Sequence, residues 1–320
     1  VQQLGKWTIF TFEGEKEDDC SVVLLNNEKE VVEKIEVPKE YCMGSLRSVA
    51  VENLKTDELL YMFEVNGKRV LDPYAHRIVG REVWNDEKRM PDAVYGAFVP
   101  SGFAWGDDRS PEIDRSQMIM YKLHVRGFSM DAKVSTTNGT FQAVSARIPY
   151  LQGIGVTTVE LMPVYEFEER IFPEEKVLPD YIQWEAEDAD MIVPPEETKV
   201  LPKLNFWGYT KGNYFAVKSS YARNAAKASM EYKALIRKLH QHGMECVMEF
   251  FFPEGTDQNL ILAALRFWVM EYHVDGFHLL GENLPMTAIA QDKRLSRTKI
   301  FYTDFGDAGE KERSYRNLYV

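Results

Sequence analysis

The feature that most constrains the fold is a regular alternation of short apolar segments and amphipathic helices from residue 117 onward. The helix patterns lie between the segments and include "FQAVSARIPYLQGIGV" (141–156), "SMEYKALIRKLHQHGM" (229–244) and "LILAALRFWVMEYH" (260–273). Strands that alternate with helices predict a parallel sheet of βαβ units, whose strands are apolar because both faces are buried. The five predicted strands are "MIMYKLHV", "TTVELMPV", "ECVMEFFF", "VDGFHLL" and "KIFYTDFG". A closed (β/α)8 barrel needs eight strands, so the sequence predicts a partial TIM-type barrel.

The first part of the chain has a different pattern. Residues 1–95 contain short alternating strands bounded by charged turns, which predicts an immunoglobulin-like β-sandwich. Asn66 and Gly67 form the dipeptide that favours a tight type I′ hairpin turn. Residues 96–116 are expected to link the sandwich to the barrel portion at 117–320, so the chain is predicted to be multi-domain.

Charge and cysteine content exclude several classes of protein. Asp and Glu number 50 against 38 Lys and Arg, which argues against a nucleic-acid partner and is compatible with a neutral sugar. Three cysteines without pairing or zinc spacing favour a reducing cytoplasm, with neither metal nor cofactor expected. No apolar run is long enough to span a membrane, and no signal peptide is expected at the start. The chain begins at Val1, and we expect it to be a fragment.

Several motifs, in order, resemble the first half of an α-amylase-superfamily barrel, glycoside hydrolase family 13. They are "MIMYKLHVRGFSMD", "GVTTVELMPVYEF", "NFWGYTKGNYFAV", "HGMECVMEFFF" and "LRFWVMEYHVDGFHLL". The branch they are most similar to contains glycogen debranching enzymes, isoamylases and pullulanases. "YMFEVNGKRVLDPYA" and "GREVW" resemble the family 48 carbohydrate-binding module that precedes such barrels. The resemblance implies a retaining α-1,6-glucan debranching hydrolase.

The positions that carry catalysis in this family are altered here. The family's strand-four motif reads Val-Asp-Gly-Phe-Arg-Phe-Asp and ends in the nucleophile. Here His278 replaces the arginine and Leu280 replaces the nucleophilic aspartate. On strand three, Glu249 takes the Asp position, while Pro253 and Glu254 replace Asn and His. Thr303 takes the position of the acid/base glutamate.

These replacements remove the groups that the chemistry needs. Leucine has no lone pair to attack an anomeric carbon and no charge to stabilise an oxocarbenium-like transition state. The candidate substitutes are Glu249, Glu282 and Asp304. Glu282 lies two residues beyond Leu280, about 6 to 7 Å further along a strand, which is too far for a simple replacement.

Other residues on the expected functional face are candidates for sugar binding, although each also has a structural interpretation. Aromatic rings can stack on glucose or fill the core, and polar groups at strand ends can bind ligand or form internal hydrogen bonds. The candidates are Trp207, Tyr209, Glu249, Glu254, His124, Arg126 and Tyr165.

Three hypotheses follow from the sequence. The first is a catalytically inactive debranching-enzyme homologue that binds an α-1,4/α-1,6-glucan or maltooligosaccharide, or regulates a partner. The second is an active debranching hydrolase with relocated carboxylates, and the third is a structural subunit without sugar binding. Because a partial barrel exposes strand edges, a second chain or a C-terminal half of the same protein is expected to cover them.

Overall fold

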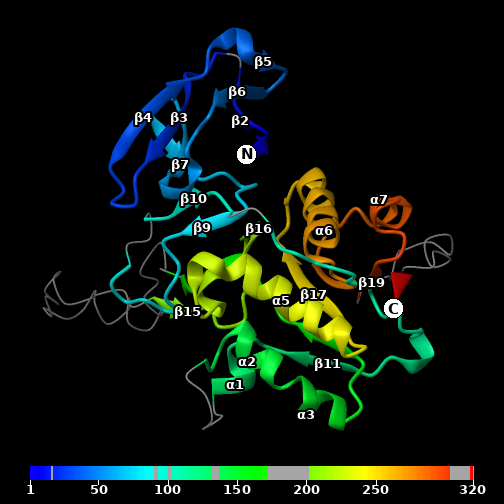
Figure 1. Ribbon diagram of the computed structural model, residues 1–320. Coiled ribbons are helices and arrows are strands. Elements are labelled where there is room, and N and C mark those ends of the chain that lie inside the picture. The colour runs from blue at the N-terminus through cyan, green and yellow to red at the C-terminus, as the bar shows by residue number, and fades with distance from the viewer. Residues whose placement is uncertain are drawn as a thin grey trace, which may run out of the picture.

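The computed structural model describes residues 1–15, 17–89, 93–99, 102–130, 137–171, 202–302 and 318–319. Figure 1 shows the N-terminal strands in blue at one end, and the yellow and orange helices beside a parallel sheet at the other. This arrangement agrees with the predicted order of a β-sandwich followed by part of an α/β barrel.

The N-terminal part consists of two antiparallel sheets. One sheet has the order β1 (Gln2–Leu4), β2 (Trp7–Glu13), β6 (Leu46–Glu52) and β5 (Cys42–Met43). The other has the order β4 (Val31–Glu36), β3 (Cys20–Leu25), β7 (Leu60–Val65), β10 (Tyr95–Ala97) and β9 (Arg77–Val79), with β8 (Lys68–Val70) paired to β7. The predicted hairpin turn is confirmed, since Asn66 and Gly67 have φ angles of 50° and 77° between β7 and β8.

The parallel sheet forms the second part. Its order is β11 (Met120–Leu123), β12 (Thr158–Leu161), β17 (Glu245–Phe252), β18 (Gly276–Gly281), β19 (Lys299–Tyr302) and β20 (Leu318–Tyr319). Four of the first five strands lie within their predicted segments, β18 extends one residue beyond its segment to Gly281, and the short β20 was not predicted. Two small antiparallel pairs flank the sheet: β13 (Tyr165–Phe167) with β16 (Gly212–Val217), and β14 (Arg170–Ile171) with β15 (Lys203–Leu204).

The helices differ from the prediction in one place. The expected helix at 141–156 is two helices, because Pro149 lacks an amide hydrogen and lies in the first turn of a new helix. The α-helices are α1 (Gly127–Met130), α2 (Phe141–Ala146), α3 (Ile148–Gly153), α5 (Ala228–Gln241), α6 (Gln258–Tyr272) and α7 (Met286–Gln291). Short 3-10 turns occur at Lys39–Tyr41, Thr56–Glu58, Arg115–Gln117, Ser219–Tyr221 and Ala225–Lys227. None of the helices in these ranges is long and apolar enough to cross a membrane.

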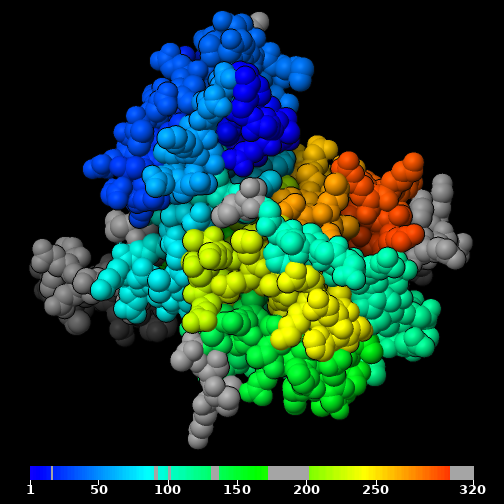
Figure 2. Space-filling view, in the orientation of Figure 1, coloured from blue at the N-terminus to red at the C-terminus, as the bar shows by residue number. Residues whose placement is uncertain are grey.

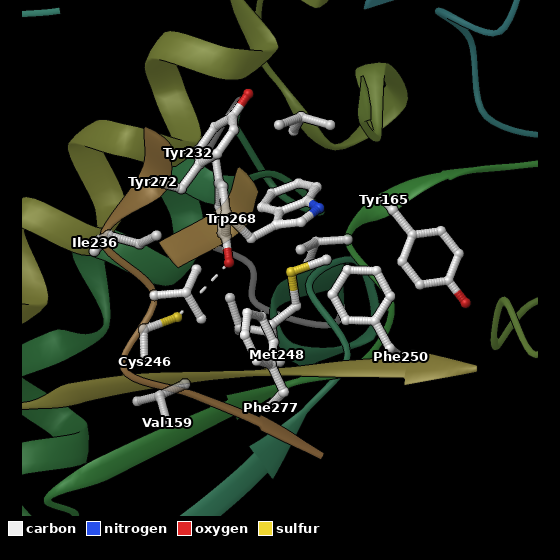
Figure 3. Close-up of a cluster of buried hydrophobic side chains, with 14 of the residues drawn as sticks. Val159, Tyr165, Tyr232, Ile236, Cys246, Met248, Phe250, Trp268, Tyr272 and Phe277 are labelled. Carbon is white, nitrogen blue, oxygen red and sulfur yellow. Dashed lines mark hydrogen bonds between the residues drawn. The ribbon is translucent and has the colours of Figure 1, made fainter. Parts of the chain in front are cut away.

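The core forms where α5 and α6 pack against β17 and β18. Figure 3 shows side chains of the two helices directed toward those of the strands. Trp268 on α6 is fully buried and packs on Phe250 of β17, and its indole nitrogen donates to the Tyr214 carbonyl at 2.6 Å. Successive residues of a strand point to opposite faces, so the packing of Phe250 directs the preceding residue, Glu249, to the other side of the sheet.

Aromatic contacts and hydrogen bonds join the two parts. The ring of Tyr74 lies 4.8 Å from that of Phe215, and the ring of His76 lies 4.5 Å from that of Phe267 on α6. Ala216 of β16 belongs to the core of the sandwich. In Figure 2 the blue and cyan residues and the yellow and orange residues form one continuous surface. The expected boundaries near 95 and 116 stay a prediction, although strand β10 continues to Ala97.

A buried ion cluster stabilises the junction between β13 and β16. The ammonium of Lys218 lies 2.7 Å from Glu166 and 2.6 Å from Glu169, and all three side chains are fully buried. Arg89 adds a guanidinium 3.2 Å from the second oxygen of Glu169. Each buried charge has lost its hydration by water, and only these contacts compensate for that loss.

We expect Lys218→Met to lower the free energy of unfolding by roughly 3–5 kcal/mol, because it leaves two buried carboxylates short of a cation. Lys34→Met is the matched control: Lys34 pairs with Glu64 at 2.6 Å but is half exposed, so its loss should cost at most about 1 kcal/mol. Urea denaturation of both variants measures the two costs. Equal costs would contradict the role assigned to the buried cluster.

Candidate functional site

The candidate site lies on the inner face of the parallel sheet, toward the carboxyl ends of its strands. It consists of Lys122 on β11, Glu160 on β12, Glu249 on β17 and His278 on β18. Within β17, Cys246, Met248 and Phe250 pack against the helices, so the alternate residue Glu249 faces the opposite side. Phe277 and Leu279 act in the same way on β18 and direct His278 inward.

These four side chains form a connected polar network. The ammonium of Lys122 donates to Glu249 at 2.7 Å and lies 3.6 Å from Glu160. The Nδ1 atom of His278 lies 2.8 Å from Glu160 Oε1. Each buried carboxylate is therefore held by a basic group of the chain itself, so neither is a free base or nucleophile.

Charge coupling in the network acts on Lys122. Partial burial lowers the pKa of this ammonium. The hydrogen bond and charge of Glu249, together with the charge of Glu160, raise the pKa by more, so the net change is an increase. Lys122 therefore stays protonated at neutral pH and acts as the resident cation between the two carboxylates.

The expected nucleophile position belongs to the same face but carries no charge. Leu280 is two residues beyond His278, is partly buried, and pairs in register with Phe251 of β17. Glu282 and Glu254 are exposed and lie beyond their strands, so the structure does not bring them into the network. Thr303 and Asp304 lie outside the described residues.

Tyr209 joins the network from the segment before β16. Its hydroxyl donates to Glu249 Oε2 at 3.1 Å, and burial together with the Glu249 charge raises its pKa. Trp207, two residues earlier, exposes 52% of its surface, and its ring lies 5.8 Å from that of His124. Tyr209 thus contacts the network at Glu249, whereas Trp207 packs beside His124.

His124 and Arg126 are held by internal contacts. The His124 ring bonds to the Phe206 carbonyl and to the Tyr221 hydroxyl, both at 2.9 Å. Burial lowers the pKa of His124 to about 4. The Arg126 guanidinium lies 5.3 Å above the ring of Trp84. These contacts match the structural interpretation of both residues.

Tyr165 lies away from any surface that a sugar can reach. Its side chain is fully buried and stacks on Phe250 at 5.1 Å between ring centres. Its hydroxyl is 3.3 Å from the Gly208 carbonyl and 3.4 Å from the Phe251 carbonyl. The structure therefore makes Tyr165 a core residue.

Three of the network residues have the composition of a metal site. Glu160, Glu249 and His278 place one ligand atom each within 4.8 Å of one another, although the sequence spacing predicted no such cluster. The Lys122 ammonium bonds to Glu249 and lies close to Glu160, so it occupies the place where a cation would bind. The fit to a metal is therefore poor while Lys122 is present.

Sequence reasoning missed Lys122 and Glu160. Both are charges inside apolar segments whose two faces were expected to be buried, and such charges need partners. A charged residue inside an apolar segment indicates that its side chain has an oppositely charged partner in the interior. It does not identify that partner, because Lys122 and Glu249 are 127 residues apart.

No family model matches the chain. Isoamylase 3, chloroplastic, of Oryza sativa subsp. japonica is 27% identical, over 85% of this chain and 43% of the relative. The glycogen operon protein GlgX homolog of Haemophilus influenzae is 24% identical, over 74% of this chain and 43% of the relative. The chain thus spans less than half the length of these curated relatives.

A solved pullulanase from Paenibacillus barengoltzii, a mutant complexed with maltotriose, shares the fold. It superposes with a TM-score of 0.72 at 18% identity, over 98% of this chain and 56% of the pullulanase. Fold and site together define an α/β protein whose parallel sheet, preceded by two antiparallel sheets, is compatible with part of a barrel. The chain is a homologue of isoamylases, GlgX and pullulanases, the debranching enzymes of glycoside hydrolase family 13.

The depressed pKa of His124 predicts acid sensitivity. In the unfolded chain His124 is protonated below about pH 6.5, whereas in the folded chain it is protonated only below about pH 4. The free energy of unfolding therefore falls as the pH falls through this window. We expect His124 to contribute about 2 kcal/mol of destabilisation at pH 5 relative to pH 7.

Chemical denaturation of His124→Gln between pH 7 and pH 4.5 tests this prediction. The slope of stability against pH should be shallower than in the parent protein, even though the variant also loses hydrogen bonds at every pH. His76→Gln is the companion variant, because burial lowers the pKa of His76 to about 4 as well. An unchanged slope in the double variant would overturn the prediction.

Proposed function

We propose that this chain is an α-glucan-binding protein of the debranching-enzyme type that has lost hydrolytic activity. The observation that carries the proposal is the apolar Leu280 at the nucleophile position, beside a network in which Lys122 and His278 already hold the two buried carboxylates. A retaining glycosidase needs a free carboxylate to attack the sugar and a carboxylic acid to protonate the leaving group. The network offers neither, because Lys122 and His278 bond to its two carboxylates.

Sugar binding is supported by two aromatic residues of the segment that precedes β16. Trp207 is half exposed, and Tyr209 presents a partly exposed ring whose hydroxyl is fixed by Glu249. Aromatic faces suit the apolar faces of glucose rings, while fixed polar groups suit the hydroxyls. The Paenibacillus pullulanase that shares the fold was solved with maltotriose, which supports the same ligand class for this chain.

Calorimetry with a branched maltooligosaccharide tests the proposal, with released reducing ends assayed afterwards. We expect binding without product. Trp207→Ala should weaken binding about tenfold, corresponding to about 1.4 kcal/mol of lost stacking. Tyr150→Ala on α3 is the control, since its ring is similarly exposed, at 49%, but lies on a different helix. An absence of binding by the folded parent protein would favour a structural subunit instead.

One observation supports an active enzyme as the alternative. Oxygen atoms of Glu160 and Glu249 lie within 4.8 Å of each other, close to the separation of about 5–5.5 Å between the carboxyl groups of retaining glycosidases. Activity from this pair requires release of Lys122. If product forms, Glu249→Gln should abolish it, whereas Glu282→Gln, at an exposed position outside the network, should leave it intact.

We also propose a cytoplasmic location and a partner along the sheet edge. The cysteines lack a pairing pattern, and Cys20 and Cys246 are buried free thiols. Among the described residues, β11 pairs with β12 alone, so its other edge carries unpaired backbone groups. Another segment of the protein or a second chain suits that edge.

A further inference from the structure

A second cavity lies at the opposite end of the parallel sheet from the Glu249 network. Its volume is 720 Å³, and its wall includes residues that directly precede strands β18 and β19. Segment 108–112 forms one side, and loop 293–298 between α7 and β19 forms another. Figure 2 shows the teal residues of the first segment near the orange-red residues of the second.

The wall concentrates positive charge in a chain whose net charge is −12. Arg109, Lys293, Arg294 and Arg297 all line the cavity. Arg297 pairs with the exposed Glu112 at 3.2 Å. Within the part of the chain that the structure describes, the side chains of Arg109, Lys293 and Arg294 have no ion-pair partner, so their charges are free to attract a ligand.

The acidic residues of the wall do not cancel this charge, because their carboxylates are bonded within the protein. Asp108 and Asp275 each expose only 2% of their side chains. Asp108 contacts His240 at 3.0 Å and His273 at 2.7 Å. Asp275 accepts from His240 at 3.0 Å, from the Cys246 amide at 2.7 Å and from the Ser110 hydroxyl.

Local contacts fix the basic loop before any ligand arrives. Asp292 accepts from the Arg294 amide at 2.8 Å and forms an ion pair with Arg266 of α6. Leu295 is fully buried and anchors the middle of the loop, and Thr298 is buried at its end. A loop held in this way loses little entropy when its cations engage an anion.

We propose that this cavity binds a small phosphorylated metabolite, with Arg109 and Arg294 contacting the phosphate. Guanidinium groups match the geometry of phosphate oxygens and stay charged at any physiological pH. The volume falls within the range of about 300–1,000 Å³ that is usual for small-molecule sites, which leaves room for more than the phosphate itself. This site is separate from the sugar site and does not depend on the function proposed there.

Calorimetric titration of the folded chain with inorganic phosphate and with glucose 6-phosphate tests the proposal, at low ionic strength because surface attraction is screened by salt. We expect both anions to bind and the sugar phosphate to bind more tightly. Arg109→Gln/Arg294→Gln should weaken the binding of both at least tenfold.

The control is Lys68→Gln/Arg69→Gln, which makes the same charge change on the exposed strand β8 and should leave both affinities within about twofold of the parent protein, since only general screening is altered. Equal weakening by the two double variants would overturn the proposal, because attraction would then depend on net charge alone. An absence of binding at millimolar concentrations of both anions would also overturn it. Maltooligosaccharide binding by Arg109→Gln/Arg294→Gln should equal that of the parent, which separates this test from that of the sugar site.

Discussion

The contact between Lys122 and Glu249 is the interaction on which the inner face of the parallel sheet depends. Glu249 faces inward because Met248 and Phe250 on either side of it pack against the helices, so its carboxylate must be compensated from within the sheet. Lys122 comes from β11, two strands away, and it also approaches Glu160 of the intervening strand. One ammonium thus connects three strands and balances the charge of both buried carboxylates on this face.

The same compensation explains why Leu280 is tolerated. An aspartate at this position would add a third carboxylate near Glu160 and Glu249, with only Lys122 and His278 to balance it. Leucine instead lies in register beside another apolar residue, Phe251. Under the proposed loss of activity, the apolar Leu280 and the internal ion pairs of Glu160 and Glu249 are electrostatically consistent with one another.

The sequence was sufficient for the main strands of the parallel sheet but not for the pairing of charges. Apolar runs identified strands β11, β12, β17, β18 and β19, because burial on both faces leaves a local pattern. Asn66 and Gly67 identified a turn for an equally local reason, the positive φ angles they allow. The Lys122–Glu249 contact, the burial of Tyr165 and the basic cavity join residues far apart in the chain, and no local pattern encodes which distant residues meet.

The two ends of the parallel sheet differ in charge in a way that suits different ligands. At the carboxyl ends, carboxylates are neutralised internally and aromatic rings remain accessible, a combination that favours a neutral, hydroxyl-rich molecule. At the amino ends, the carboxylates are again satisfied internally, by His240 and His273, but here guanidinium and ammonium groups are left over. Because the cavity and the Glu249 network lie at opposite ends of the sheet, an anion bound in the cavity would not compete with a sugar at the network. Strand β18 offers a direct route for coupling between the two sites, since Asp275 of the basic cavity immediately precedes it and His278 of the Glu249 network lies on it.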